Sequence, residues 1–334
     1  MVSAVIFVAT SCVSPLTGFA FWETNLAYEG ESIYNYLQVK NLSDRTILST
    51  NVLFGVQSVT MKDKGLTGMY YDTALAAPAL ADNANSALIL GMGTGTYARQ
   101  LKQYYPKMNI TGVEIDQKIT DLAGEYFDEP ADIPVTTYDG RAWLAASHDK
   151  YDVIMVDAYQ DITIPFQMSS TEFFTMVREH LNPGGVMVVN MNMISDGQGS
   201  INEALSDTIA SVFGNGNTLT ADVPNTTNRE LFAKKPGSGS EENSMQQASK
   251  ALNLRETTYE RTGSEDLEWY MEEVASRFRK VNEPDSASTI LTDDKAPVEV
   301  LGMHAIEQII ADEAGPYRQI LKDEGFGGLL RAVQ

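Results

Sequence analysis

Short apolar runs alternate with amphipathic stretches through the middle of the chain. The apolar runs predict strands, and they lie at Ala87–Leu90, Ile110–Val113, Pro134–Thr137, Tyr151–Val156 and Val186–Met191. Thr171–Leu181 and Ile201–Phe213 show helical spacing instead. Strict alternation of helix and strand predicts an α/β fold with a doubly wound, largely parallel sheet and right-handed crossovers. Thr218–Val223 and Glu230–Lys234 are expected to add a terminal antiparallel pair.

The segments on either side of this region have different patterns. β-rich stretches that predict hairpins lie at Ser32–Val39, Thr46–Phe54 and Val56–Met61. Tyr71–Leu80 predicts a helix that leads into the alternating region, and Leu267–Val281 predicts an amphipathic helix near the other end. We therefore expect three parts: an apolar segment at 1–22, a small β-hairpin domain at 23–68, and a larger α/β domain at 69–334 with a helical extension.

The first 22 residues carry no charged side chain, and the first basic residue of the chain is Lys40. About 18 apolar residues are enough to cross a bilayer, but several Ser, Thr and Pro residues interrupt this run. Three interpretations stay open: the last transmembrane helix of a larger or truncated membrane protein, an atypical signal or lipoprotein segment ending near Cys12, and a buried strand or helix. The lone Cys12 excludes an intramolecular disulfide and a cysteine-rich metal site.

A glycine turn with G-x-G-x-G spacing directly follows the strand Ala87–Leu90. Gly91, Gly93 and Gly95 allow a sharp turn and let a ligand approach without interference from Cβ atoms. Glu114 closes the next strand about 20 residues later, where nucleoside-binding α/β domains place the carboxylate that holds the ribose hydroxyls. The dinucleotide fingerprint requires its third glycine at the position of Thr96, so NAD is a minor alternative. The spacing favours S-adenosylmethionine or its decarboxylated form.

Two more aspartates follow predicted strands of the same sheet. Asp139 precedes a predicted helix, so it is either only an N-cap or also a receiver of the adenine amino group. Asp157 ends the apolar strand Tyr151–Val156. Because ligands of open α/β folds bind at the carboxyl ends of the strands, we expect Asp157 to point into the same crevice as Gly93, Glu114 and Asp139.

Composition narrows the classes of ligand. The chain has 334 residues, 43% of them hydrophobic, which is enough for a full core and two domains. Its formal charge of −21 argues against nucleic acid, which requires a basic surface. An acidic cleft would attract a small cationic amine, although most of these charges are expected to form an ordinary solvated surface. The three histidines lack ligand spacing, so we expect no metal site.

Several short motifs lie between about Ser32 and Leu301. They are Gly55-Val56-Gln57-Ser58, Tyr70-Tyr71-Asp72, Gly91-Met92-Gly93-Thr94-Gly95, Val113-Glu114-Ile115-Asp116, Asp139-Gly140-Arg141, Val156-Asp157-Ala158-Tyr159 and Leu291-Thr292-Asp293-Asp294-Lys295-Ala296-Pro297-Val298-Glu299. Together they resemble the spermidine synthase family, in particular the spermidine-synthase-like proteins that are fused to membrane segments in prokaryotes.

The resemblance implies a Rossmann-like sheet of the methyltransferase and spermidine synthase type, and it implies roles for single residues. Glu114 would bind the donor's ribose, and the glycine turn and Asp116 would also take part in binding the donor. Asp139 and Gly140 would recognise the adenine. Gln57 and Tyr70 would line the site, and Asp157 would be the catalytic acidic residue.

The chain also departs from the family's pattern at three places. Thr94 stands in the glycine turn where the family usually has an Asp that helps to hold the donor's aminopropyl amine. Gln160 stands where a second Asp is usual, although Asp161 is adjacent, and we expect Asp161 to contact the substrate. The histidine and glutamate that normally follow the site tyrosine are Tyr71 and Asp72.

These observations predict a transferase that displaces a sulfonium. Asp157 would hold an amine acceptor and take its proton, while Tyr159 and Gln57 fix its direction. Aminopropyl transfer from decarboxylated S-adenosylmethionine is the first hypothesis. Two alternatives stay open: methyl transfer from S-adenosylmethionine, and a non-catalytic nucleoside-binding module of a membrane protein. We expect a cytoplasmic catalytic domain, with a membrane anchor at residues 1–22 and a homo-oligomer both left open.

Overall fold

The computed structural model describes residues 23–51, 56–128, 130, 132–158, 164–191, 199–237, 244–286, 288–303 and 322. The predictions for residues 1–22, for Tyr159 and for Asp161 therefore lie outside the described residues. Within the described residues, no helix is long and apolar enough to cross a membrane.

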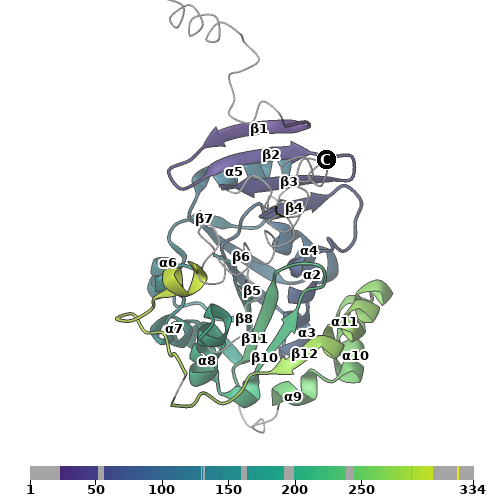
Figure 1. Cartoon of the computed structure of the whole chain (residues 1–334). Helices are drawn as coiled ribbons and strands as arrows, with labels where there is room; N and C mark the ends of the chain where they lie inside the picture. Colours follow the sequence, from purple (N-terminus) through teal and green to yellow (C-terminus); the bar gives the residue numbers. More distant parts are fainter. Residues whose placement is uncertain are drawn as a thin grey trace, which may run out of the picture.

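An eight-stranded mixed sheet forms the centre of the molecule (Figure 1). Its parallel part consists, in spatial order, of β7 (Val135–Thr137), β6 (Asn109–Glu114), β5 (Ser86–Leu90), β8 (Tyr151–Val156) and β9 (Leu181–Met191). Three antiparallel strands extend it beyond β9, namely β11 (Arg229–Lys234), β10 (Thr218–Asp222) and β12 (Phe278–Lys280). The predicted α/β fold and the terminal antiparallel pair are confirmed, and β12 adds a strand that the sequence did not indicate.

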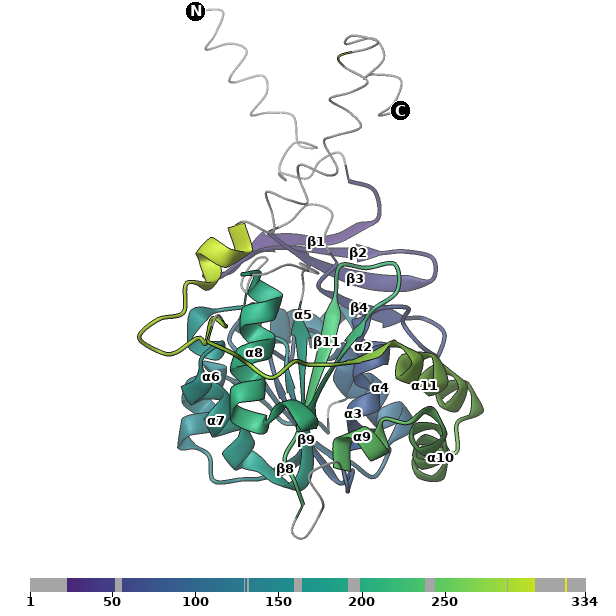
Figure 2. The ribbon, with the colours of Figure 1, turned by 60° about the horizontal axis from the view of Figure 1, so that its bottom comes forward.

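Helices cover both faces of this sheet, as a doubly wound fold requires (Figure 2). One face packs against α2 (Tyr70–Ala74), α3 (Ala76–Leu80), α4 (Thr96–Tyr104), α10 (Ala251–Thr262) and α11 (Glu265–Arg277), with the short α9 (Ser244–Ala248) beside them. The other face packs against α6 (Gly140–Ala146), α7 (Thr171–His180) and α8 (Ile201–Phe213). Two short 3-10 turns, η2 (Phe166–Met168) and η3 (Asn215–Asn217), complete the regular structure.

A second, four-stranded antiparallel sheet precedes the central one. It consists of β1 (Leu26–Glu31), β2 (Tyr36–Asn41), β3 (Arg45–Thr50) and β4 (Ser58–Met61). Leu37, Val39 and Leu48 of this sheet form a separate core with Ile119 and Leu122 of α5 (Gln117–Tyr126). The small sheet is thereby packed onto a helix of the larger unit, near the carboxyl ends of the parallel strands. The division at residue 68 stays a prediction.

Several predicted elements have different bounds in the structure, and the single helix predicted at Tyr71–Leu80 is divided into α2 and α3. The helix predicted at Leu267–Val281 ends at Arg277, and the next three residues pair with β10, because the ring of Phe278 packs edge-on against that of Phe232 at 5.6 Å. The predicted strand Ser32–Val39 begins only at Tyr36, since Ser32 to Asn35 form a hydrogen-bonded turn. The Asn-Pro-Gly-Gly stretch at 182–185 follows the end of α7, as predicted. The same stretch lies within β9, where it shifts the register of the pairing with β8.

Candidate active site

A cavity of about 360 Å³ lies at the carboxyl ends of β5, β6 and β8. β5 pairs with β6 on one side and β8 on the other, so the strand order reverses at this point, which is where open α/β sheets bind ligands. Eight of the predicted site residues line it: Gln57, Tyr70, Gly91, Gly93, Glu114, Asp139, Gly140 and Asp157. Tyr34 and Asn35, from the turn between β1 and β2, contribute to its wall from the small sheet.

The glycine turn is held against the end of β6 by Glu114. The Gly93 amide donates to one carboxylate oxygen of Glu114 at 2.8 Å, and the Asp116 amide donates to the other at 3.0 Å. Gly91 has φ = +88°, and a Cβ there would lie 2.3 Å from the backbone oxygen of Asp157, so only glycine fits. Burial raises the pKa of Glu114, and these backbone hydrogen bonds oppose the rise. Glu114 is therefore fixed in position at the cavity wall.

Asp157 is held by hydrogen bonds to both of its carboxylate oxygens. The Tyr70 hydroxyl donates to one oxygen at 2.6 Å, and the Asn190 side-chain amide donates to the other at 2.9 Å. Asn228 in turn donates to the Asn190 amide oxygen at 2.9 Å. Burial raises the pKa of Asp157 to about 7, the two hydrogen bonds lower it, and the charge of Glu114 raises it further. A carboxyl group with this pKa can both accept and release a proton near neutral pH.

Two stacked tyrosines form the wall beside Asp157. The ring centroids of Tyr70 and Tyr71 are 4.0 Å apart, and the Tyr71 hydroxyl donates to the backbone oxygen of Gln57 at 2.7 Å. Burial is the main reason that the pKa of each tyrosine is raised, so both stay neutral hydrogen-bond donors. Tyr70 thus orients Asp157, and Tyr71 fixes the segment that carries Gln57.

Asp139 is an N-cap that also lies in the cavity lining, and its contact with an adenine amino group stays a prediction. Its carboxylate accepts from the Ala142 amide at 2.7 Å, so it caps α6, and it also lines the cavity. Ile115 and Tyr138 lie beside it with 40% and 56% of their surfaces exposed. Exposed apolar side chains can pack against the faces of a flat ring, and a neighbouring carboxylate can accept a hydrogen bond from an amino group on that ring.

Two predicted donor-binding residues take structural positions outside the cavity wall. Gly95 is the N-cap of α4. The Asp116 carboxylate caps α5 and accepts hydrogen bonds from Ser32 at 2.5 Å and Asn35 at 3.1 Å. Asp116 therefore ties the β1–β2 turn to the larger unit, and through Asn35 it supports the cavity wall indirectly.

Thr94, at the first position that departs from the family's pattern, is fully buried. Its hydroxyl has no hydrogen-bond partner in the structure as described. It does not line the cavity wall formed by the described residues. The structure thus offers no ammonium-binding carboxylate at this point of the turn.

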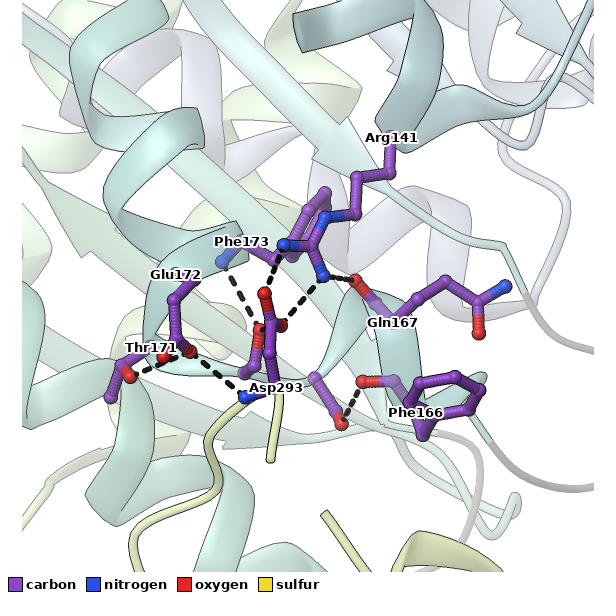
Figure 3. A network of polar contacts seen from close by, with 9 residues as sticks. Arg141, Phe166, Gln167, Thr171, Glu172, Phe173 and Asp293 are labelled. Carbon is purple, nitrogen blue, oxygen red and sulfur yellow. Dashed lines mark hydrogen bonds and ion pairs between the residues drawn. The ribbon is translucent and has the colours of Figure 1, made fainter. Parts of the chain in front are cut away.

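Figure 3 shows a polar network around Arg141 and Asp293. Arg141 donates to both carboxylate oxygens of Asp293, at 2.7 and 2.6 Å, and to the backbone oxygen of Gln167 at 2.7 Å. Ser170 donates to the same aspartate at 2.5 Å. Gln167 and Met168 line the cavity, so the network connects the segment around Asp293 to the cavity wall.

Sequence reasoning missed the residues that support the site from the adjoining strands. Asn190 is on β9 and Asn228 immediately precedes β11, and neither has a motif that marks it. Glu230, on β11, is buried beside Asn190. The predicted antiparallel pair included Glu230, but it did not indicate that this strand lies beside β9.

The chain is similar to known proteins in both sequence and structure. Residues 69–235 match the family model for the spermine/spermidine synthase domain. A probable polyamine aminopropyl transferase from Bifidobacterium longum is 99% identical over 334 residues, and the chain spans 75% of that protein. A polyamine aminopropyltransferase from Corynebacterium efficiens is 37% identical over 131 residues, which are 36% of this chain and 25% of that protein.

Solved structures share the fold at lower identity. A probable spermidine synthase from Corynebacterium glutamicum has a TM-score of 0.55 and 21% identity, covering 80% of this chain and 99% of that one. Spermidine synthase from Thermotoga maritima has a TM-score of 0.52 and 19% identity, covering 64% of this chain and 74% of that one.

Proposed function

Because the chain belongs to the spermine/spermidine synthase family, we propose that it transfers an aminopropyl group from decarboxylated S-adenosylmethionine to a small cationic amine. The observation that carries the proposal is the position and environment of the Asp157 carboxyl group. Asp157 lies at the carboxyl end of β8, its carboxylate is oriented by Tyr70 and Asn190, and burial raises its pKa to about 7. An aliphatic amine has a pKa near 10.4 and arrives protonated, so the reaction requires a nearby group that takes a proton.

The donor would lie across the glycine turn. Close backbone approach at Gly91 and Gly93 leaves room for the nucleoside, and Glu114 offers two carboxylate oxygens to the ribose hydroxyls. Asp139 and Gly140 would recognise the adenine, with Ile115 and Tyr138 against its ring. In this orientation the sulfonium of the donor would lie towards Asp157.

The reaction is a displacement at the carbon attached to sulfur. The acceptor ammonium loses a proton to Asp157, and its freed lone pair forms the new carbon–nitrogen bond. The carbon–sulfur bond breaks, and its electron pair returns to sulfur, which leaves as a neutral thioether. No acid is needed for the leaving group, so the protein's contribution is to position the amine and remove its proton.

Gln57 and Tyr70 would contact the acceptor, since both line the cavity next to Asp157. Tyr159 and Asp161, which lie outside the described residues, remain candidates for orienting it. The formal charge of −21 supports a cationic acceptor, because an acidic protein raises the local concentration of cations.

Mass spectrometry of the products tests this function. The purified protein is incubated with 1,4-diaminobutane and either S-adenosylmethionine or its decarboxylated form. We expect methylthioadenosine and an amine lengthened by one aminopropyl group with the decarboxylated donor alone. S-adenosylhomocysteine and a methylated acceptor would instead establish methyl transfer. Binding of both donors without any product would establish a nucleoside-binding module.

A further inference from the structure

Glu230 is a buried carboxyl group that the proposed mechanism does not use. Its side chain is 0% exposed. Neither carboxylate oxygen has a hydrogen-bond partner among the residues that the structure describes. An ionised carboxylate in such a place costs far more free energy than a neutral acid. A buried carboxyl group without a hydrogen-bond partner requires an explanation. One explanation is that another state of the protein, such as a ligand complex, supplies the partner.

Strand register places Glu230 in line with Asp157. Val156 of β8 pairs with Val189 of β9, so Asp157 and Asn190 are the next residues along, and their side chains are hydrogen-bonded. Asn190 pairs directly with Glu230 of β11. Side chains directly opposite on paired strands share a face of the sheet. Asn190 and Glu230 are therefore cross-strand neighbours about 4.8 Å apart, and the hydrogen bond from Asn190 extends this row to Asp157, just past the end of β8.

Among the described residues, no cation forms an ion pair with Glu230. Burial, and to a lesser extent the charge of Asp157, raises the pKa of Glu230 well above the usual range. Tyr97 of α4 is close enough for its pKa to be raised by Glu230, and the Tyr97 hydroxyl donates to the Ala74 backbone oxygen. Tyr70 of α2 donates to Asp157. Ala221 of β10, opposite Glu230, is apolar.

The basic residues of the same strand are engaged elsewhere. Arg229 forms an ion pair with Asp222 at 2.5 Å, and Lys234 forms one with Asp82 at 2.7 Å. The partner of an ionised Glu230 would therefore have to arrive from outside the described residues.

We propose that Glu230 is an inducible counter-charge of the active site, neutral in the empty protein and ionised when positively charged substrates occupy the cavity beside Asp157. The inference rests on the proposed function, whose donor sulfonium and amine acceptor both bring positive charge. Asp157 and Glu114 are the anions already fixed at the cavity wall. As the substrates bind, the Glu230 proton leaves for solvent, so binding and proton release are linked.

Glu230→Gln tests this role, because glutamine has the shape of the neutral acid and cannot ionise. Glu256→Gln, at an exposed glutamate of α10, is the matched control. Each protein is titrated calorimetrically with decarboxylated S-adenosylmethionine and with 1,4-diaminobutane, in two buffers of different ionisation enthalpy. The difference between buffers gives the number of protons released. Methylthioadenosine, an uncharged nucleoside, serves as the reference ligand.

We expect Glu230→Gln to release about one proton fewer than the wild type and to bind the cationic ligands about tenfold more weakly, because it lacks the attraction between the buried charge and the cation. Methylthioadenosine affinity and the control variant should match the wild type. Equal proton release and equal affinity in Glu230→Gln would overturn the inference while leaving the proposed function intact. A wild-type protein that binds neither cationic ligand would overturn the proposed function, and the inference with it.

Infrared difference spectroscopy gives an answer that does not depend on the variant's folding. At pH 8.5, above the pKa of Asp157, the wild type should show a neutral carboxyl band that disappears when the substrates bind. A band that persists in the substrate complex would contradict the inference.

Discussion

Arg141 and Asp293 form a two-point ion pair that joins the first turn of α6 to a segment 152 positions later in the chain. Arg141 also holds the backbone oxygen of Gln167, which lines the cavity. The ion pair therefore supports the cavity wall. Asp293 lies outside the stretch that matches the family domain, because that match ends at residue 235.

Asp293→Asn should weaken donor binding through this wall. The pair is partly exposed, so we expect about a fivefold increase in the donor's Kd, which corresponds to about 1 kcal/mol. Asp294→Asn, at the exposed neighbour, is the control and should leave Kd unchanged. Calorimetric titration measures both. Equal affinities in the two variants would show that the ion pair does not shape the cavity.

Glu114→Gln should weaken donor binding more strongly. The carboxylate accepts two backbone hydrogen bonds and is expected to accept the ribose hydroxyls. Loss of a charge-assisted hydrogen bond costs about 1.5 to 3 kcal/mol, or about a tenfold to hundredfold increase in Kd. Asp121→Asn on the exposed face of α5 provides the comparison. Unchanged donor affinity in folded Glu114→Gln would refute the ribose assignment.

Asp157→Asn should affect turnover and spare donor binding. It keeps the shape of the side chain and removes the base, so we expect kcat to fall by about 100-fold or more. The donor's Kd, measured by titration, should stay near the wild-type value. A variant with nearly normal kcat would mean that Asp157 has only a structural role.

Tyr70→Phe should shift the pH dependence of kcat. In the wild type, kcat should rise as pH increases through about 7, since the ionised form of Asp157 is the base. The hydrogen bond from Tyr70 lowers the pKa of Asp157. Removing this hydrogen bond should therefore shift the rising limb of the pH profile, where kcat increases with pH, towards alkaline pH by about one unit. Tyr71→Phe is the matched control, because its hydroxyl donates to Gln57. A limb that moves equally in both variants would contradict the assignment.

Asp157 also links stability to pH. Its pKa of about 7 in the folded protein is above the value of about 3.9 expected when unfolded. Between about pH 4 and pH 7 the folded state binds more protons, so the free energy of unfolding should fall as pH rises through this window. Asp157→Asn should flatten this decline in denaturant titrations. An unchanged slope would show that Asp157 does not cause it.

Local signals in the sequence identified much of the cavity. The strand–glycine–helix pattern around Gly93, the acid at Glu114 and the acid after β8 are close in sequence to the elements that position them. Their places at one edge follow from parallel topology alone. The bounds of α8, Ile201–Phe213, were also predicted, because its amphipathic period and its capping serine are local.

The sequence patterns did not predict contacts between segments that are distant along the chain. Glu230 and Asn190 meet because β11 inserts antiparallel beside β9, and no periodicity specifies that register. Asp116 was predicted to take part in donor binding, yet its carboxylate accepts a hydrogen bond from Ser32 in the turn between β1 and β2. The end of α11 depends on a ring contact between Phe278 and Phe232, which tertiary packing decides.

The distance along the chain between Arg141 and Asp293 also sets the order in which the site can be completed during synthesis. The ribosome makes the glycine turn, Glu114 and Asp157 long before it reaches Asp293. The ion pair that holds Gln167 cannot close until that late segment has left the exit tunnel. A nascent chain therefore carries the chemical groups of the site well before it has the finished wall around them, and its full affinity for the donor should appear only after Asp293 has emerged.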